Sequence, residues 1–345
     1  MLFDSYTTPA LSLSNRTVMS PMTRNRAVDN NTPNALMASY YAQRATAGLI
    51  ITEGTSPSPN GLGYPRIPGL FNQDHVNGWK LVTQAVHAKG GKIVVQFMHC
   101  GRVVGEENLP AGAKAVGPTS ATLEGEIYTD AKGMQPHTQP HAMTQADIDA
   151  AVAEFVHAAK LAVEAGFDGV ELHAANGYLI EQFLNANVNT RTDGYGGSAV
   201  NRNRFALEVA RATVAAIGAN RVGIRLSPYG VFNGTGGFPD VDAQYEALIQ
   251  ELSAMGAPAV PAALKATLRA AFKGPFILAG GFDHASAEAA LAAGQADLIG
   301  FGRPFLCNPD LVARMQAGAA MNAPDMGTFY TPGEKGYTDY PALTA

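Results

Sequence analysis

Short runs of almost continuous apolar residues alternate along the chain with longer, alanine-rich stretches. The short runs predict β-strands, and their lack of a polar face is typical of parallel strands in a sheet that helices cover on both sides. We expect strands at residues 18–22, 49–52, 93–97, 169–173, 222–227, 276–279 and 298–301. The alanine-rich stretches predict helices at residues 35–47, 73–88, 145–165, 179–185, 203–217, 242–254, 262–272 and 286–293.

The repeated strand and helix units predict an α/β protein, either an open doubly wound sheet or a closed barrel. No glycine-rich dinucleotide fingerprint follows the first strand, where Pro-Met-Thr-Arg stands at residues 21–24. About eight units fit within 345 residues, which favours one TIM-barrel, or (β/α)8, domain over residues 1–345. Thr144 and Asp147 form a capping-box pattern at the start of a predicted helix.

Residues 101–143, after the third strand, depart from this regular plan. The segment is too long for an ordinary loop and contains a β-prone piece at 126–129. Barrel active sites form from the loops at the carboxyl ends of the strands. We therefore expect a hairpin-bearing capping insertion over the mouth of the barrel.

The sixth strand is expected to be absent from this sequence. Only residues 255–261 separate two predicted helices, and Pro258 and Pro261 lack the N–H groups that a central strand needs. A loop, a strand and another loop would require about a dozen further residues near 253–255. A true deletion would leave buried backbone groups unpaired at roughly 1–3 kcal/mol each. We therefore favour an omitted segment, with a seven-stranded or opened barrel as the alternative.

Composition narrows the possible partners. Apolar residues make up 46% of the chain, and the net charge of −5 comes with scattered Lys and Arg. That balance predicts no nucleic-acid partner and no membrane partner. Cys100 and Cys307 are too few for a disulfide framework, and the first residues lack a signal-peptide pattern. We expect a cytoplasmic protein that acts as a monomer or homodimer.

Polar residues and glycines at the carboxyl ends of barrel strands are the default candidates for chemistry. The ends of the first five strands carry Thr23, Glu53, Gly54, Gln96, His99, His173, Asn176 and Arg225. Gly280-Gly281 and Gly302-Arg303 follow the last two strands. Glycine lets backbone amides approach an anion, and arginine adds a permanent charge, so these two turns are candidates for a phosphate site. Ordinary turns with a surface arginine are the alternative.

The turn after the fourth strand places His173, Asn176 and Tyr178 close together. The first two side chains can donate hydrogen bonds to an oxygen that gains negative charge, as a carbonyl does when its conjugated alkene accepts hydride. The phenol can act as a general acid. A core histidine, a capping asparagine and a packing tyrosine are the structural alternative.

No metal-binding spacing, nucleophile elbow or Walker loop is present, so we expect no bound metal and a cofactor that supplies the reactivity. An ordered set of motifs runs nearly from end to end of the chain: PMTR (21–24), QFMHCGR (96–102), HAANGY (173–178), NTRTDGYGG (189–197), FGRP (301–304) and GYTDYP (336–341). This set resembles the Old Yellow Enzyme flavoproteins. Each motif alone is weak, but the ordered set is specific.

The resemblance implies FMN as the bound cofactor and NADPH or NADH as the hydride donor. The residues that it assigns to FMN are Pro21, Met22, Thr23, Gly54, Gln96, His173, Arg225, Gly280, Gly281, Gly302 and Arg303. In this set Thr23 would tune the flavin carbonyl beside N5, Gln96 would read the pyrimidine edge, and Arg225 would stabilise the anionic reduced flavin.

The resemblance further implies an ene-reductase that acts on enones, enals, maleimides and nitroalkenes. His173 and Asn176 would bind the activating oxygen, flavin N5 would give hydride to the β-carbon, and Tyr178 would give a proton to the α-carbon. The residues that it assigns to the substrate pocket are Tyr64, Met98, His173, Asn176 and Tyr330. The family usually has Trp at the position of Met98, so the shape of the pocket should differ.

Three alternatives remain on the same barrel. One is a flavin-free lyase or isomerase that binds a phosphorylated substrate. Another is a relative such as a dienoyl-CoA reductase, but two distant cysteines argue against the iron–sulfur motif of such enzymes. The third is a flavin-binding protein without catalytic activity.

Overall fold

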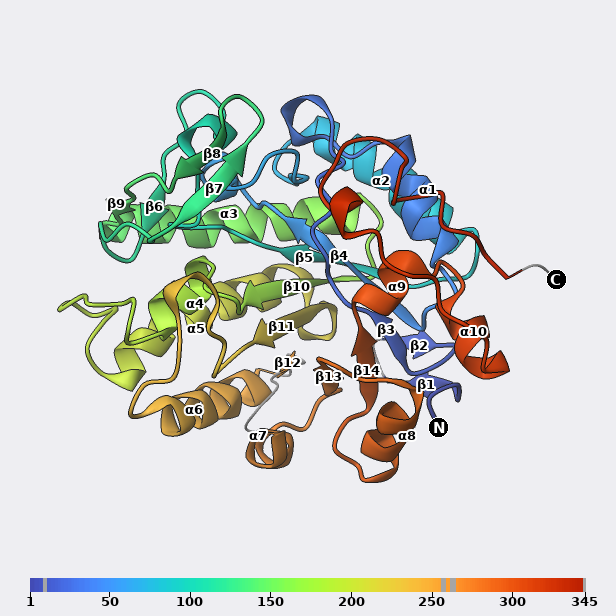
Figure 1. Cartoon of the computed structure of the whole chain (residues 1–345). Coiled ribbons are helices and arrows are strands. Elements are labelled where there is room, and N and C mark those ends of the chain that lie inside the picture. The colour runs from blue at the N-terminus through green and yellow to red at the C-terminus, as the bar shows by residue number, and fades with distance from the viewer. Residues whose placement is uncertain (9–10, 256–258, 261–264, 344–345) are drawn as a thin grey trace.

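The computed structural model describes residues 1–8, 11–255, 259–260 and 265–343. Eight parallel strands form one curled sheet at the centre of the molecule (Figure 1). These strands are β3 (Thr17–Met19), β4 (Leu49–Thr55), β5 (Ile93–Phe97), β10 (Gly169–Ala174), β11 (Val222–Leu226), β12 (Ala259–Val260), β13 (Ile277–Ala279) and β14 (Leu298–Phe301). The helices are α1 (Ala35–Gln43), α2 (Gln73–His87), α3 (Gln145–Glu164), α4 (Leu179–Leu184), α5 (Ala199–Ile217), α6 (Val241–Ala254), α7 (Lys265–Ala271), α8 (His284–Ala292), α9 (Arg303–Cys307) and α10 (Leu311–Ala317).

The strand order is that of a barrel. It runs β12-β11-β10-β5-β4-β3-β14-β13, so that β14, the last strand in the chain, lies beside β3. β12 and β13 form the two ends of this order and contact each other, but no paired register joins their described residues. The predicted α/β barrel is therefore confirmed, with its seam between β12 and β13.

Local sequence sets the ends of the helices. The Asn34 side chain accepts a hydrogen bond from Met37 N at 3.1 Å and begins α1. Thr144 and Asp147 form the predicted capping box of α3. Gly166, with a φ of 88°, follows α3 in the left-handed conformation that suits glycine. Within the described ranges, no helix combines the length and the apolar character that crossing a bilayer would require.

The main core lies between the sheet and its helices, where Trp79 of α2 and Phe155 of α3 are buried. A separate apolar cluster inside the barrel includes Val18 and Ile51. The hairpin of β1 (Tyr6–Thr7) and β2 (Ser12–Leu13), which the sequence did not predict, adds Leu13 to this cluster. Burying an aliphatic or aromatic side chain contributes about 1.5–3 kcal/mol, so both clusters help to hold the barrel together.

The prediction that residues 255–261 cannot form the sixth strand is wrong. Ala259 and Val260 form β12, which pairs in parallel with β11. Both residues carry backbone N–H groups, so a strand of two residues can pair with β11 although prolines flank it in the sequence. The flanking prolines, and part of the step from residue 253 to residue 256, lie outside the described residues. The expectation of an omitted segment thus stays a prediction.

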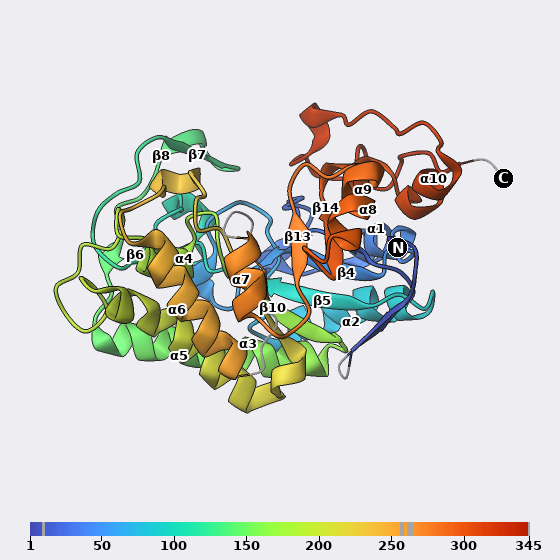
Figure 2. The same ribbon diagram turned by 90° about the horizontal axis from the view of Figure 1, so that it is seen from below.

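Residues 101–143 contain the predicted hairpin. β7 (Glu126–Thr129) pairs antiparallel with β8 (Gly133–Pro136), and β6 (Val116–Gly117) pairs with β9 (His141–Ala142). Seen from two directions, this hairpin and the C-terminal segment stand at the same end of the sheet (Figures 1 and 2). The two segments can therefore share a site above the strands.

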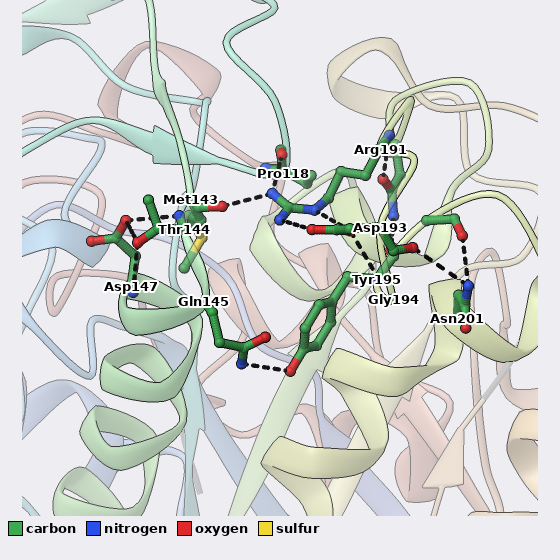
Figure 3. Close-up of polar contacts among 12 residues, drawn as sticks. Pro118, Met143, Thr144, Gln145, Asp147, Arg191, Asp193, Gly194, Tyr195 and Asn201 are labelled. Atoms are coloured by element: carbon green, nitrogen blue, oxygen red, sulfur yellow. Dashed lines mark hydrogen bonds and ion pairs between the residues drawn. The ribbon is translucent and has the colours of Figure 1, made fainter.

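Arg191, in the loop between α4 and α5, binds two points of this excursion, one in its interior and one at its C-terminal end. Its Nη1 donates to the carbonyl oxygens of Pro118 and Met143, each at 2.7 Å (Figure 3). Asp193 accepts from Nε at 3.0 Å and from Nη2 at 2.5 Å. Because a bidentate pair fixes the direction of an arginine, the 189–197 motif helps to hold the segment directly after β6 and at its C-terminal end.

Candidate active site

β10 ends at Ala174, and a tight turn leads from it into α4. Asn176 lies in this turn with a φ of 59°, a left-handed conformation that asparagine tolerates better than most residues. Its N–H donates to Ser227 Oγ at 2.9 Å, and its carbonyl oxygen accepts from Asn233 Nδ2 at 2.7 Å. The residues after β11 therefore hold the turn that carries His173 and Asn176.

His173 is 4% exposed, and its Nδ1 has no hydrogen-bond partner among the described residues. Burial, followed by the charge of Arg225, holds the pKa of the imidazole well below its usual value. The ring is therefore neutral at neutral pH, with one nitrogen that donates and one that accepts. A buried polar atom without a partner is uncommon in a native protein, and it fits a nitrogen that a ligand would pair.

Tyr178 begins α4 and packs against His173, with ring centroids 5.0 Å apart. Its Oη lies 3.2 Å from Tyr64 Oη. Burial raises the pKa of the Tyr178 phenol well above its usual value, so the phenol keeps its proton across the neutral range. Both tyrosines line a cavity of about 760 Å³, together with Thr23 and Tyr330. The cavity is also lined by hairpin residues, among them Met134.

The loop after β3 brings Thr23 to this cavity. β3 ends at Met19, earlier than the sequence predicts, which leaves Pro21, Met22 and Thr23 outside the strand. The cavity has Thr23 in its lining, and Met22 packs against the main core. The loop thus joins the barrel core to the candidate site.

Gly54 and Met98 pack against each other at the ends of β4 and β5. A Cβ atom on Gly54 would come within 2.5 Å of Met98 Sδ, so only glycine fits there. Met98 is 2% exposed and belongs to an apolar cluster against which Tyr64 and Tyr178 pack. Met98 therefore lies behind the two tyrosines and is not part of the cavity lining.

Gln96 of β5, Glu171 of β10 and Arg225 of β11 come from three adjacent strands. Gln96 Nε2 donates to Glu171 Oε1 at 2.7 Å, and Glu171 is 5% exposed. The side chain of Arg225 makes no hydrogen bond or ion pair with any described residue. An arginine that is partly buried and unpaired fits a site for an anionic group.

Two glycine turns stand at the ends of the neighbouring strands β13 and β14. Gly280 and Gly281 have φ values of 117° and 72°, and a Cβ atom on either would meet nothing within 4 Å. Gly302 lies close to Met22, since a Cβ atom there would be 3.7 Å from Met22 Sδ. Arg303 is exposed, and its side chain makes no hydrogen bond or ion pair with the described residues. Open glycine turns beside an unpaired arginine fit a phosphate group.

The sequence analysis did not identify Glu171, although a signal was present. A carboxylate stands in the middle of the apolar run of residues 169–173, where a strand covered on both sides normally has none. Arg66 and Asp130, which form an ion pair at the edge of the cavity, were also missed. They lie on a loop and on the hairpin, where no periodic pattern identifies them.

The site combines neutral hydrogen-bond donors, a protonated phenol and two arginines with unpaired side chains. This set is typical of a barrel oxidoreductase whose reactivity comes from a phosphate-bearing cofactor. Residues 1–322 match the family described as NADH:flavin oxidoreductase / NADH oxidase. The chain belongs to this family, and it is an FMN-dependent enzyme of the ene-reductase type. The resemblance to the Old Yellow Enzyme family is thereby confirmed.

Three relatives illustrate the similarity. A probable flavin mononucleotide-dependent alkene reductase of Leishmania infantum is 41% identical over 96% of this chain and 94% of its own length. The structure of morphinone reductase in complex with tetrahydroNAD is 42% identical, with a TM-score of 0.94 over 99% of this chain and 98% of that one. The old yellow enzyme homologue from Zymomonas mobilis is 38% identical, with a TM-score of 0.95 over 99% of both chains. These findings do not favour a flavin-free lyase or isomerase.

Proposed function

We propose that this enzyme reduces C=C bonds that a carbonyl or nitro group activates, with NADPH or NADH as the reductant. The observation that carries the proposal is the turn after β10, where His173, with its unpartnered nitrogen, packs against Tyr178 at the edge of the cavity. The similarity to a probable flavin mononucleotide-dependent alkene reductase and to morphinone reductase in complex with tetrahydroNAD supports it. Enones, enals, maleimides and nitroalkenes are the expected substrates.

FMN, when bound, supplies the hydride that the nicotinamide has delivered to it. The ring system of FMN would contact four residues at the ends of β3 and β4, namely Pro21, Met22, Thr23 and Gly54. Its pyrimidine end would be held by Gln96 and Arg225. The phosphate would lie at the two glycine turns, with Arg303 as its counter-charge. The open space beside Gly280 and Gly281 supports this placement.

His173 and Asn176 would donate hydrogen bonds to the oxygen of the activating group. Because burial keeps His173 neutral, its N–H can stabilise negative charge on that oxygen without giving up its proton. Tyr178 would then give its proton to the α-carbon, and its raised pKa means that the phenol is protonated when the reaction begins. Tyr64 and Tyr330 would form walls of the pocket, with Met98 supporting Tyr64 from behind.

The two cysteines fit a protein of the reducing cytoplasm. Cys100 and Cys307 are both buried and unpaired, and burial raises the pKa of the Cys100 thiol. Neither thiol is therefore poised for nucleophilic chemistry. We propose that the enzyme acts in the cytoplasm as a monomer or homodimer.

Isotope labelling tests the proposed reaction. The holoenzyme would reduce cyclohexenone with NADPH in deuterium oxide, and mass spectrometry and NMR would locate the label in cyclohexanone. We expect solvent deuterium at the α-carbon and hydrogen from the nicotinamide at the β-carbon. Solvent deuterium at the β-carbon, or no turnover of any activated alkene, would contradict the proposal.

A further inference from the structure

Glu171 is a buried carboxylate that neither the mechanism nor the packing of the core requires. It lies in β10 with Gln96 of β5 as its register partner, and two residues before His173, so both side chains leave the same face of the strand. Arg225 of β11 is the register partner of His173 on the other side. Glu171 thus stands between the two residues proposed to hold the pyrimidine end of FMN.

The hydrogen bond between Gln96 and Glu171 determines which way the Gln96 amide points. When Glu171 is ionised, its carboxylate can only accept hydrogen bonds, so the NH₂ end of the amide faces Glu171. The 2.7 Å contact from Gln96 Nε2 to Glu171 Oε1 has this direction. The side-chain carbonyl oxygen of Gln96 and its second N–H then both remain available, in fixed positions, to a ligand that offers one donor and one acceptor.

The charge of Glu171 has a second consequence. The Arg225 side chain has no hydrogen-bond partner among the described residues. Glu171 lies on the adjacent strand, two residues before His173, the register partner of Arg225, and the charge of Arg225 acts to lower the pKa of Glu171 against the larger effect of burial. A negative charge beside Arg225 reduces the positive potential that the arginine presents to an anionic ligand. A carboxylate here should therefore make a neighbouring cofactor harder to reduce.

We propose that Glu171 is a positioning residue of the FMN site: it orients the Gln96 amide for the flavin pyrimidine edge and offsets the charge of Arg225, which keeps the reduction potential of FMN low. This inference deepens the proposed function, because it rests on FMN lying against Gln96 and Arg225. It adds a third residue to that contact and assigns it two separable effects.

Two conservative variants separate the effects. Glu171→Gln removes the charge but keeps an oxygen that can accept from Gln96. Glu171→Asp keeps the charge but moves the carboxylate back by one methylene, out of reach of a 2.7 Å contact. Glu154→Gln is the control, because Glu154 is a half-buried glutamate whose pKa burial also raises, but it lies on the outer helix α3.

The readouts are the midpoint potential of bound FMN and the dissociation constant of FMN from the deflavinated protein, with no alkene present. Glu171→Gln should shift the reduction equilibrium at least tenfold toward reduced FMN, which is about 30 mV for a two-electron couple, at near wild-type affinity. Glu171→Asp should weaken FMN binding at least tenfold with a smaller change in potential. Glu154→Gln should change neither.

A wild-type potential in Glu171→Gln, or wild-type FMN affinity in Glu171→Asp, would overturn the inference. Because neither readout uses an alkene, its failure is distinguishable from failure of the proposed function. A wild-type protein that binds FMN and does not reduce alkenes would contradict the proposed function alone.

Discussion

The barrel has two unequal sides. On one side, β4, β5 and β10 have seven, five and six residues, every one of them buried. On the other side, β12 has two residues and β13 has three, and β13 pairs only with β14 among the described residues. The long strands carry the residues proposed for chemistry, whereas the short strand β13 carries one of the two glycine turns proposed for the phosphate.

This difference indicates how the barrel divides its tasks. Hydrogen-bond donors must be held in a fixed geometry to stabilise a developing charge. A strand that is paired on both edges provides this fixed geometry. A phosphate can be held by backbone amides and a flexible arginine, which tolerate a less constrained strand end. The side beside the seam should therefore influence cofactor affinity more than the rate of the chemical step.

The largest effect is expected on the long-strand side. His173→Ala combined with Asn176→Ala removes both donors, and the loss of one such donor typically costs roughly a hundred- to thousandfold in rate. Alkene reduction should fall by about a thousandfold or more, and phenolic ligands should bind far more weakly, while FMN stays bound. Stopped-flow reoxidation and phenol titration measure the two effects. Unchanged phenol affinity would remove these residues from the substrate site.

Tyr178→Phe should produce the next largest effect. Loss of a general acid typically slows a reaction by roughly 10²–10⁴-fold, and enone reduction should fall within that range. Reduction of nitroalkenes to nitronates should be spared, because a nitronate does not need its proton at once. Parallel kinetics with cyclohexenone and a nitroalkene test this. An equal loss with both substrates would make Tyr178 a packing residue.

A smaller effect is expected beside the seam, from Gly281→Ala. The left-handed φ of 72° disfavours alanine by about 1–2 kcal/mol, so FMN should bind about 5- to 30-fold more weakly while alkene reduction by the bound fraction continues. Gly294→Ala is the control, because Gly294 has a similar φ of 66° and is also free of close contacts. Both variants should lose stability, but only Gly281→Ala should release FMN. Equal FMN affinity in the two variants would move the phosphate elsewhere.

The smallest effect is a difference in local stability within the unaltered protein. Among the residues that the structure describes, β13 is paired on one edge, whereas β5 is paired on both, with β4 and β10. Amides of β13 should therefore exchange with solvent at least about tenfold faster than those of β5. Hydrogen exchange followed by mass spectrometry measures the ratio. Equal protection would mean that the seam does not weaken this side.

Much of the fold could be predicted because every long strand is an apolar run covered on both faces. The bounds of β5 and β14 agree with the prediction at both ends. The prediction for residues 255–261 is wrong because it excludes the whole segment from the sheet on account of Pro258 and Pro261. A strand can consist of only two residues, and Ala259 and Val260 form one. The β1–β2 hairpin could not be predicted either, because each of its strands has only two residues and two residues show no periodicity.

The site could be predicted less completely, because strand register cannot be read from a single sequence. Register pairs Glu171 with Gln96 and His173 with Arg225, and without it Glu171 is only an unexpected charge. The burial of Met98 depends on an irregular register between β4 and β5 that brings Gly54 against it. The residues of the 173–178 turn were identifiable because polar groups at a strand end stand out from the apolar run before them.

The most direct test of the central claim, that this barrel uses bound FMN to pass hydride to an activated alkene, is an anaerobic absorbance titration of the purified holoenzyme. We expect flavin absorbance at the start, bleaching on addition of NADPH or NADH, and full return of the absorbance when cyclohexenone is added. A protein without flavin absorbance, or one whose reduced flavin is not reoxidised by any activated alkene, would contradict the account.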